Sequence, residues 1–148
     1  MNAGPRFTVE PGHVMAFARA VGERGMMDSP PAPGTPVPVT FTATDNQFDP
    51  AHMRGMRPTG PLATESASGG SVLHAEQHFE YLEPVRVGDV LTVTQLDGRA
   101  WDKLSRRGGQ VRFREIIKEY RNQDDRLLVR ARMVLVETDP PGPGATDR

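Results

Sequence analysis

The stretch VLHAEQHFEY places His74, Glu76 and His78 at every second position. Two imidazoles and a carboxylate could bind a metal ion or exchange protons with a substrate. In a strand, however, they would simply share one face, and a metal would need ligands converging from elsewhere. The other histidines, His13 and His52, have no ligand motif around them. We therefore interpret the row as the polar outer face of a half-buried strand and predict no metal site.

The opposite face of this predicted strand is apolar, with one exception. It carries Leu73, Ala75, Phe79 and Tyr81, and between them Gln77 is the one polar residue. Because a buried amide needs hydrogen-bond partners, we take Gln77 as a candidate substrate-binding residue.

The second half of the chain reads as an antiparallel sheet. Four segments alternate or run in the β-branched, apolar manner of strands: 72–81, 90–96, 110–121 and 127–138. Segments rich in turn-forming residues separate them, at 83–89, 97–109 and 122–125. Trp101 falls in the second of these expected loops. We predict a β-meander.

The first half supplies the cover that such a sheet requires on one face. A β-like piece at 7–9 precedes a helix of roughly 12–22 whose apolar residues recur at helical spacing: Val14, Phe17, Ala18 and Val21. The proline-rich residues 28–38 exclude helix and central strand, and 39–48 could form a short helix. The predicted fold class is α+β.

Composition limits the remaining possibilities. We expect one domain over residues 1–138 and a disordered tail at 139–148. The charge is balanced, 18 basic against 19 acidic residues, which gives no support to a nucleic-acid partner. No run of apolar residues is long enough for a membrane span. The chain has no cysteine, which excludes thiolate chemistry and fits a cytoplasmic location.

Several of these stretches resemble the MaoC-like dehydratase N-terminal family. LHAEQHFEYLEPVRVGDVL is similar to the signature of that family, and VMAFARAVGE, PVPVTF and the final strand pair agree with it. The resemblance covers about Phe7 to Glu137. It implies a hot-dog fold, in which a curved antiparallel sheet wraps around a helix. It also implies a homodimer, or a heterodimer with another hot-dog subunit, acting on acyl-CoA or acyl-carrier-protein thioesters without a further cofactor.

The resemblance also locates the expected catalytic pair. Active members carry Gly-Asp-x-Asn-Pro-x-His, whose Asp and His activate water for addition to an enoyl thioester. Here the matching stretch is GERGMMD, so Glu23 and Asp28 stand at those positions and Asn-Pro is absent. Two carboxylates could divide the acid and base roles if burial separated their pKa values. We favour the interpretation that the pair has been lost.

The resemblance suggests further contacts with substrate. In PVPVTF, Val37, Val39 and Phe41 are candidates for thioester and acyl contact, although they could equally pack a helix against the sheet. The methionines of the following loop, Met53 and Met56, are candidates of the same kind.

Two arginines, Arg106 and Arg107, could meet the phosphates of CoA or an acidic carrier protein, or simply form a hairpin tip.

Three functions remain open at this point. The first is a catalytically degenerate hydratase/dehydratase subunit paired with an active hot-dog partner. The second is an active homodimer, either a hydratase using Glu23 and Asp28 or a thioesterase using Glu76 and Gln77. The third is a non-catalytic acyl-CoA binding protein.

Overall fold

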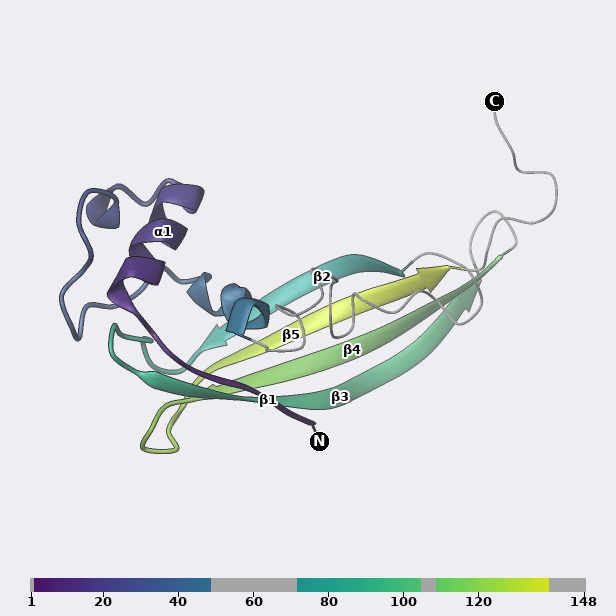
Figure 1. The fold of residues 1–148 in the computed structure, drawn as a ribbon. Coiled ribbons are helices and arrows are strands. Elements are labelled where there is room, and N and C mark those ends of the chain that lie inside the picture. The colour runs from purple at the N-terminus through teal and green to yellow at the C-terminus, as the bar shows by residue number, and fades with distance from the viewer. Residues whose placement is uncertain (1, 49–71, 105–108, 139–148) are drawn as a thin grey trace, which may run out of the picture.

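A computed structural model describes residues 2–48, 72–104 and 109–138 of the chain. A long, curved antiparallel sheet carries a helical region at one end and on one face (Figure 1). The strands are β1 (Asn2–Thr8), β2 (Val72–Tyr81), β3 (Val90–Leu104), β4 (Gln110–Arg121) and β5 (Leu127–Thr138). The helices are α1 (Pro11–Val21) and the short 3₁₀ helices η1 (Arg24–Met26) and η2 (Phe41–Phe48). The predicted α+β class is confirmed.

Helix α1 begins and ends where its sequence dictates. Pro11 occupies the first turn, where its missing N–H has no helical partner to lose. Gly22 ends the helix in a left-handed conformation at φ 75°, which glycine adopts without steric cost. Val14 and Ala18 are fully buried, whereas Val21 is 52% exposed. The expected apolar face is therefore correct except at its C-terminal residue.

The strand order is β1-β3-β4-β5-β2. Strands β3, β4 and β5 form the expected meander, but β2 pairs antiparallel with β5 at the edge of the sheet. The prediction that β2 continues the meander into β3 is wrong. The segment between β2 and β3 instead crosses from one side of the sheet to the other, so the two consecutive strands are separated by two others.

Strand β3 is longer than its sequence predicts, because a bulge interrupts its alternation. The expected strand ends at residue 96, yet β3 continues to Leu104 through a register shift between Asp97 and Ala100. At Gly98 an added Cβ would lie 2.6 Å from the Cβ of Glu115, so only glycine allows the bulge to approach β4 this closely. Trp101 is therefore in a strand, stacked on Phe113, and not in a hairpin loop.

The proline-rich segment is irregular, as expected, and it is fastened to the connection between β2 and β3. Gly34 N–H donates to the carbonyl of Val87 at 2.8 Å, and Val37 N–H donates to that of Val85 at 2.9 Å. Val85 and Val87 are buried. Residues 34–37 therefore form a strap held by backbone hydrogen bonds over one end of the core.

The core lies between this strap, the helices α1 and η2, and the sheet. Its buried members come from every layer: Phe7, Val14, Phe41, Leu91, Tyr120 and Val129, among others. Helix η2, blue in Figure 1, lies over the sheet beside α1. Its residues border two cavities, Thr42 the first and Ala43, Asp45 and Asn46 the second.

Candidate functional site

A bulge in β2 changes which residues face the core. The pairing with β5 shifts register between His74 and Glu76, so His74 joins the face of Gln77 and Phe79 instead of that of His78. His74 lines a cavity against η2, and its Nε2 lies 3.0 Å from the carbonyl oxygen of Glu76. The prediction that His74 belongs to the polar outer row is therefore wrong, because simple alternation does not survive a bulge.

The rest of the predicted outer row lies where it was expected. Glu80 pairs with Arg130 at 3.0 Å on the face away from η2. Glu76 contacts Nε2 of His78 at 3.3 Å on that same face. Glu76 and Gln77 project from opposite faces of β2, so in this chain they do not meet one substrate from the same side.

The cavity beside His74, which we call the Lys118 cavity, has a volume of about 260 Å³. Lys118 Nζ on β4 donates to Oδ2 of Asp45 on η2 at 2.7 Å and to Oδ1 of Asn46 at 3.2 Å. The Lys118 and Asp45 side chains are only 11% and 3% exposed. This buried charge pair is closed by hydrogen bonds, as a desolvated pair must be.

Tyr120 completes the same cluster. Burial, and then the neighbouring Asp45 carboxylate, raise the pKa of Tyr120 well above its usual 10.0. The phenol therefore stays protonated at any physiological pH. Gln77 lies at the side of the cavity but is exposed, with long 3.4 Å contacts to the carbonyls of His78 and Arg132. It is not the buried amide that its strand face predicted.

The second cavity, which we call the Thr42 cavity, has a volume of about 300 Å³. Its walls come from residues 36–39, residues 81–85 and Val129. Val37 and Val39, both expected to contact substrate, line it. Phe41 does not: it is fully buried, with its ring edge-on to Phe17 at 5.6 Å.

Among the described side chains of η2, Thr42 is the one that lines this cavity. It is 1% exposed, and its hydroxyl has no hydrogen-bond partner among the described residues. Thr44, two residues further along η2, does have a hydrogen-bond partner, because its hydroxyl donates to the Phe41 carbonyl at 2.8 Å. A buried hydroxyl without a partner costs free energy.

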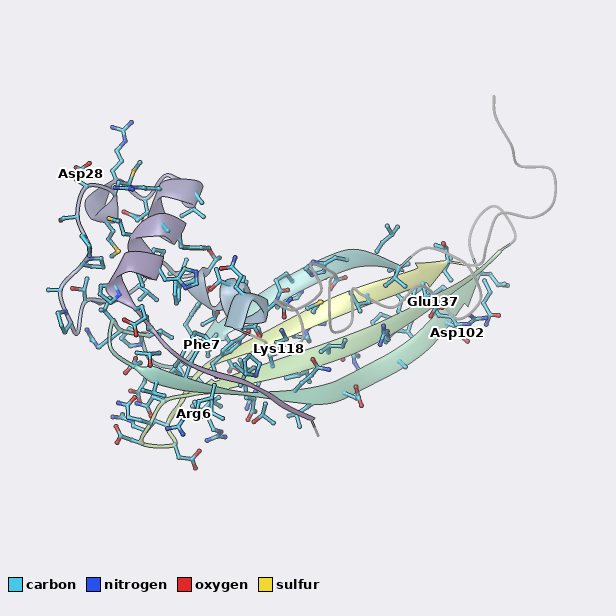
Figure 2. All side chains as sticks on the ribbon, in the orientation of Figure 1. Arg6, Phe7, Asp28, Asp102, Lys118 and Glu137 are labelled. Atoms are coloured by element: carbon cyan, nitrogen blue, oxygen red, sulfur yellow. The ribbon has the colours of Figure 1, made fainter. Side chains whose placement is uncertain are left out.

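The two carboxylates at the positions of the family's catalytic pair lie elsewhere. The side chain of Glu23 accepts the Gly25 N–H at 3.4 Å and caps η1. Glu23 also lines an open hollow that shares residues 37–39 with the Thr42 cavity. Asp28 is exposed and lies on the loop at the edge of the helical region, away from the sheet (Figure 2). Their catalytic role stays a prediction.

Other predictions fall outside the described residues. Arg106, Arg107, His52 and the tail 139–148 are among them, as are the two methionines of the 49–71 segment. Within residues 2–48, 72–104 and 109–138, no three His, Cys, Asp or Glu side chains gather as metal ligands would. No helix in these ranges has the length and apolar character needed to cross a membrane.

Sequence reasoning missed Thr42, Asp45 and Lys118. Thr42 stands beside the more conspicuous Phe41, and no pattern of spacing tells which of two neighbours faces a cavity. Asp45 and Lys118 are 73 residues apart, and only the packing of η2 on β4 brings them together. One feature of the sequence did indicate Lys118: on β4 it shares the inward-packing face with Ile116 and Tyr120, which lie two positions before and after it.

Solved structures similar to this chain show the hot-dog fold. The C-terminally truncated HadBC (3R-hydroxyacyl-ACP dehydratase) complex from Mycobacterium tuberculosis matches with a TM-score of 0.53 at 18% identity, over 88% of this chain and 89% of the other. The ChsH1–ChsH2 complex from the same organism matches at 0.65 and 13%, over 97% and 86%. A MaoC-like dehydratase from Rhodospirillum rubrum matches at 0.55 and 18%, over 94% and 90%. The predicted hot-dog fold is confirmed.

A family model matches residues 2–131, which is most of the chain. Its description is "FAS1-like, dehydratase domain region". No match is found among curated protein sequences. The matched residues run from β1 to the first part of β5. The chain therefore belongs to the FAS1-like dehydratase-domain family, of the MaoC-like hot-dog type.

Proposed function

We propose that this chain is the catalytically degenerate half of a hydratase/dehydratase that acts on enoyl or 3-hydroxyacyl thioesters. The observation that carries the proposal is the placement of Glu23 and Asp28. Glu23 uses its carboxylate to cap η1, and Asp28 is exposed at the edge of the helical region. A general base and its acid partner must reach the same substrate atoms within hydrogen-bond distance, and the placement of these two carboxylates supports the loss of such a pair.

A partner subunit would supply the missing pair. Two of the similar structures are complexes of two named chains, HadBC and ChsH1–ChsH2. In this chain β2 is an edge strand, and edge strands commonly pair with another chain. Three large apolar side chains on or beside that strand are about half exposed: Leu73, Tyr81 and Leu82. These features support a second hot-dog subunit docked along β2, with the acyl thioester bound close to the interface. The cytoplasmic location stays a prediction.

The test is activity with and without a partner. The chain is purified alone and after co-expression with a hot-dog protein that carries the Gly-Asp-x-Asn-Pro-x-His motif. Hydration of crotonyl-CoA is then measured as the decrease in enoyl absorbance. We expect turnover only in the complex. Glu23→Gln in this chain should leave kcat within about twofold, while replacing the motif histidine of the partner should abolish turnover.

The opposite pattern would support an active homodimer. If the chain alone hydrates crotonyl-CoA, and both Glu23→Gln and Asp28→Asn abolish the activity, the degenerate-subunit proposal is wrong. If acyl-CoA binds but no partner yields turnover, the chain is an acyl-CoA binding protein instead.

A further inference from the structure

On the face of the sheet away from η2, acidic and basic side chains alternate from strand to strand. Glu119 on β4, Arg130 on β5 and Glu80 on β2 are register partners in one row. The Arg130 guanidinium donates to the Glu119 carboxylate at 3.0 Å and to the Glu80 carboxylate at 3.0 Å. Over the middle of the sheet the pattern is acidic on β4 (Glu115, Glu119), basic on β5 (Arg130, Arg132) and acidic again on β2 (Glu76, Glu80).

The carboxylates of β4 and β2 differ in how closely arginines surround them. Glu115 lies between Arg99 on β3 and Arg132 on β5, and its side chain is 4% exposed. Glu80 contacts Arg130 on β5 and no other arginine among the described residues, and its side chain is 56% exposed. The difference follows from the position of β2 at the edge of the sheet, because β5 lies on one side of it and no described strand lies on the other.

Glu76 is paired from one side in the same way. Its Oε2 lies 3.9 Å from Nη2 of Arg132 on β5 and 3.3 Å from Nε2 of His78 on its own strand. We call Glu76 and Glu80 the acidic column of β2. A strand paired beyond β2 would bring its outward side chains to about 5 Å from this column. Basic side chains there would continue the alternation, and acidic ones would repel.

The apolar contacts at this edge do not choose between partners. Leu73, Tyr81 and Leu82 offer the same half-exposed surface to a second copy of this chain as to a different subunit. Charged groups at an interface contribute more to the choice of partner than to affinity. A second copy paired along β2 would bring two acidic columns together, and like charges facing each other across strands are destabilising.

We propose that the acidic column of β2 selects a partner whose pairing strand carries Arg or Lys on the same outward face, and that it disfavours pairing with a second copy of this chain. This inference rests on the proposed function for the docking of a hot-dog subunit along β2. It extends that proposal by naming the charge that the subunit must carry at the seam.

The probe is the full chain with its column reversed, Glu76→Lys/Glu80→Lys, which offers basic outward side chains on an otherwise identical edge. Sedimentation equilibrium at low salt measures the association of wild type alone, of the reversed variant alone and of an equimolar mixture of the two. Glu119→Gln is the matched control, because Glu119 contacts the same Arg130 but lies two strands away from the edge.

We expect the mixture to associate about tenfold more tightly than either chain alone, since opposite charges then face each other across the seam. The difference should disappear in about 1 M NaCl, which screens charges at the surface. Glu119→Gln should associate as the wild type does, both alone and when mixed with the reversed variant.

A second variant covers the case in which the reversed chain does not fold, as judged by urea unfolding. Glu76→Gln/Glu80→Gln removes the repulsion without placing cations beside Arg130 and Arg132. It should self-associate more tightly than the wild type at low salt, and as the wild type does at high salt.

Two results would overturn the inference. The first is a mixture that associates no more tightly than wild type alone, and the second is a neutral variant that self-associates no more tightly than wild type. Neither result bears on turnover with a partner that carries the catalytic motif. Charge-dependent association without turnover in any complex would instead remove the proposed function and keep the selective edge.

Discussion

The two cavities beside η2 differ in whether the buried polar groups next to them have hydrogen-bond partners. On one side Lys118 donates to Asp45, and Tyr120 lies beside the same carboxylate. On the other side the Thr42 hydroxyl is buried and has no partner among the described residues. The Lys118 cavity is therefore bordered by a paired charge cluster, whereas the Thr42 cavity is bordered mainly by prolines and valines.

The largest effect is expected from breaking the charge pair. Asp45→Asn leaves the Lys118 ammonium buried without its counter-ion, which typically costs about 3–5 kcal/mol of stability. Urea unfolding of the variant measures it. The double variant Asp45→Leu/Lys118→Met removes both charges and should recover most of the loss. A double variant as unstable as the single one would mean that the side chains matter for their shape and not for their charges.

A smaller loss is expected from Tyr120→Phe. The variant removes the buried phenol beside the Asp45 carboxylate, and polar contacts with charged groups contribute roughly 1.5–3 kcal/mol. The matched control is Tyr81→Phe, because Tyr81 is 46% exposed and its loss should stay within about 0.5 kcal/mol. Similar losses at both positions in urea unfolding would contradict the distinction between a paired cluster and an open surface.

The opposite sign is expected for Thr42→Val. Removing a buried hydroxyl that has no partner should stabilise the ligand-free chain by about 1 kcal/mol, visible as a higher Tm. Thr44→Val should instead lose about 1 kcal/mol, because it leaves the Phe41 carbonyl without its donor. If both variants lose stability alike, Thr42 has an internal partner and the contrast between the cavities fails.

On the face of the sheet away from η2, charged side chains are also paired, but one partner is exposed to solvent. Hydrogen bonds from the Arg99 side chain and backbone, and from Arg132, lower the pKa of Glu115 from its ordinary 4.5 to about 2. Arg99 is 78% exposed, so solvent screens this pair more than it screens Lys118 and Asp45. The expected contribution to stability is correspondingly smaller.

The sign of the pH dependence follows from the direction of that shift. A carboxyl whose pKa is lower in the folded chain contributes stability above its ordinary pKa and loses it as the pH falls towards the folded value. The stability difference between wild type and Glu115→Gln should therefore be constant above about pH 5 and shrink between about pH 4.5 and 2. Unfolding in urea across this range measures it, and a difference that does not change with pH would exclude the ionised form as its source.

Local patterns in the sequence predicted the regular elements well. The bounds expected for β2, β4 and β5 agree with the structure, because clear turn residues separate these strands. Helix α1 was predicted from its spacing and from Pro11 and Gly22. The error in β3 has a local cause: Asp97-Gly98 resembles a hairpin turn, but here the glycine forms a bulge against Glu115.

The candidate site was predicted only in outline. Val37, Val39 and Phe41 were named as candidates for acyl contact because the stretch that contains them resembles the family. Val37 and Val39 line a cavity, whereas Phe41 is buried in the core, as the alternative packing role predicts. His74 was assigned to the outer face, since alternation gives no sign of the bulge that turns it inward.

By itself the sequence determined the class of fold, the family and the position of most strands, because periodicity and turn residues act over a few positions along the chain. Only the tertiary structure decided which polar groups find partners. The contact between Asp45 and Lys118 spans 73 residues, and the Thr42 hydroxyl is buried without a partner among the described residues. Hydrogen bonds are satisfied in space and not along the chain, so these outcomes could be found only after the fold was known.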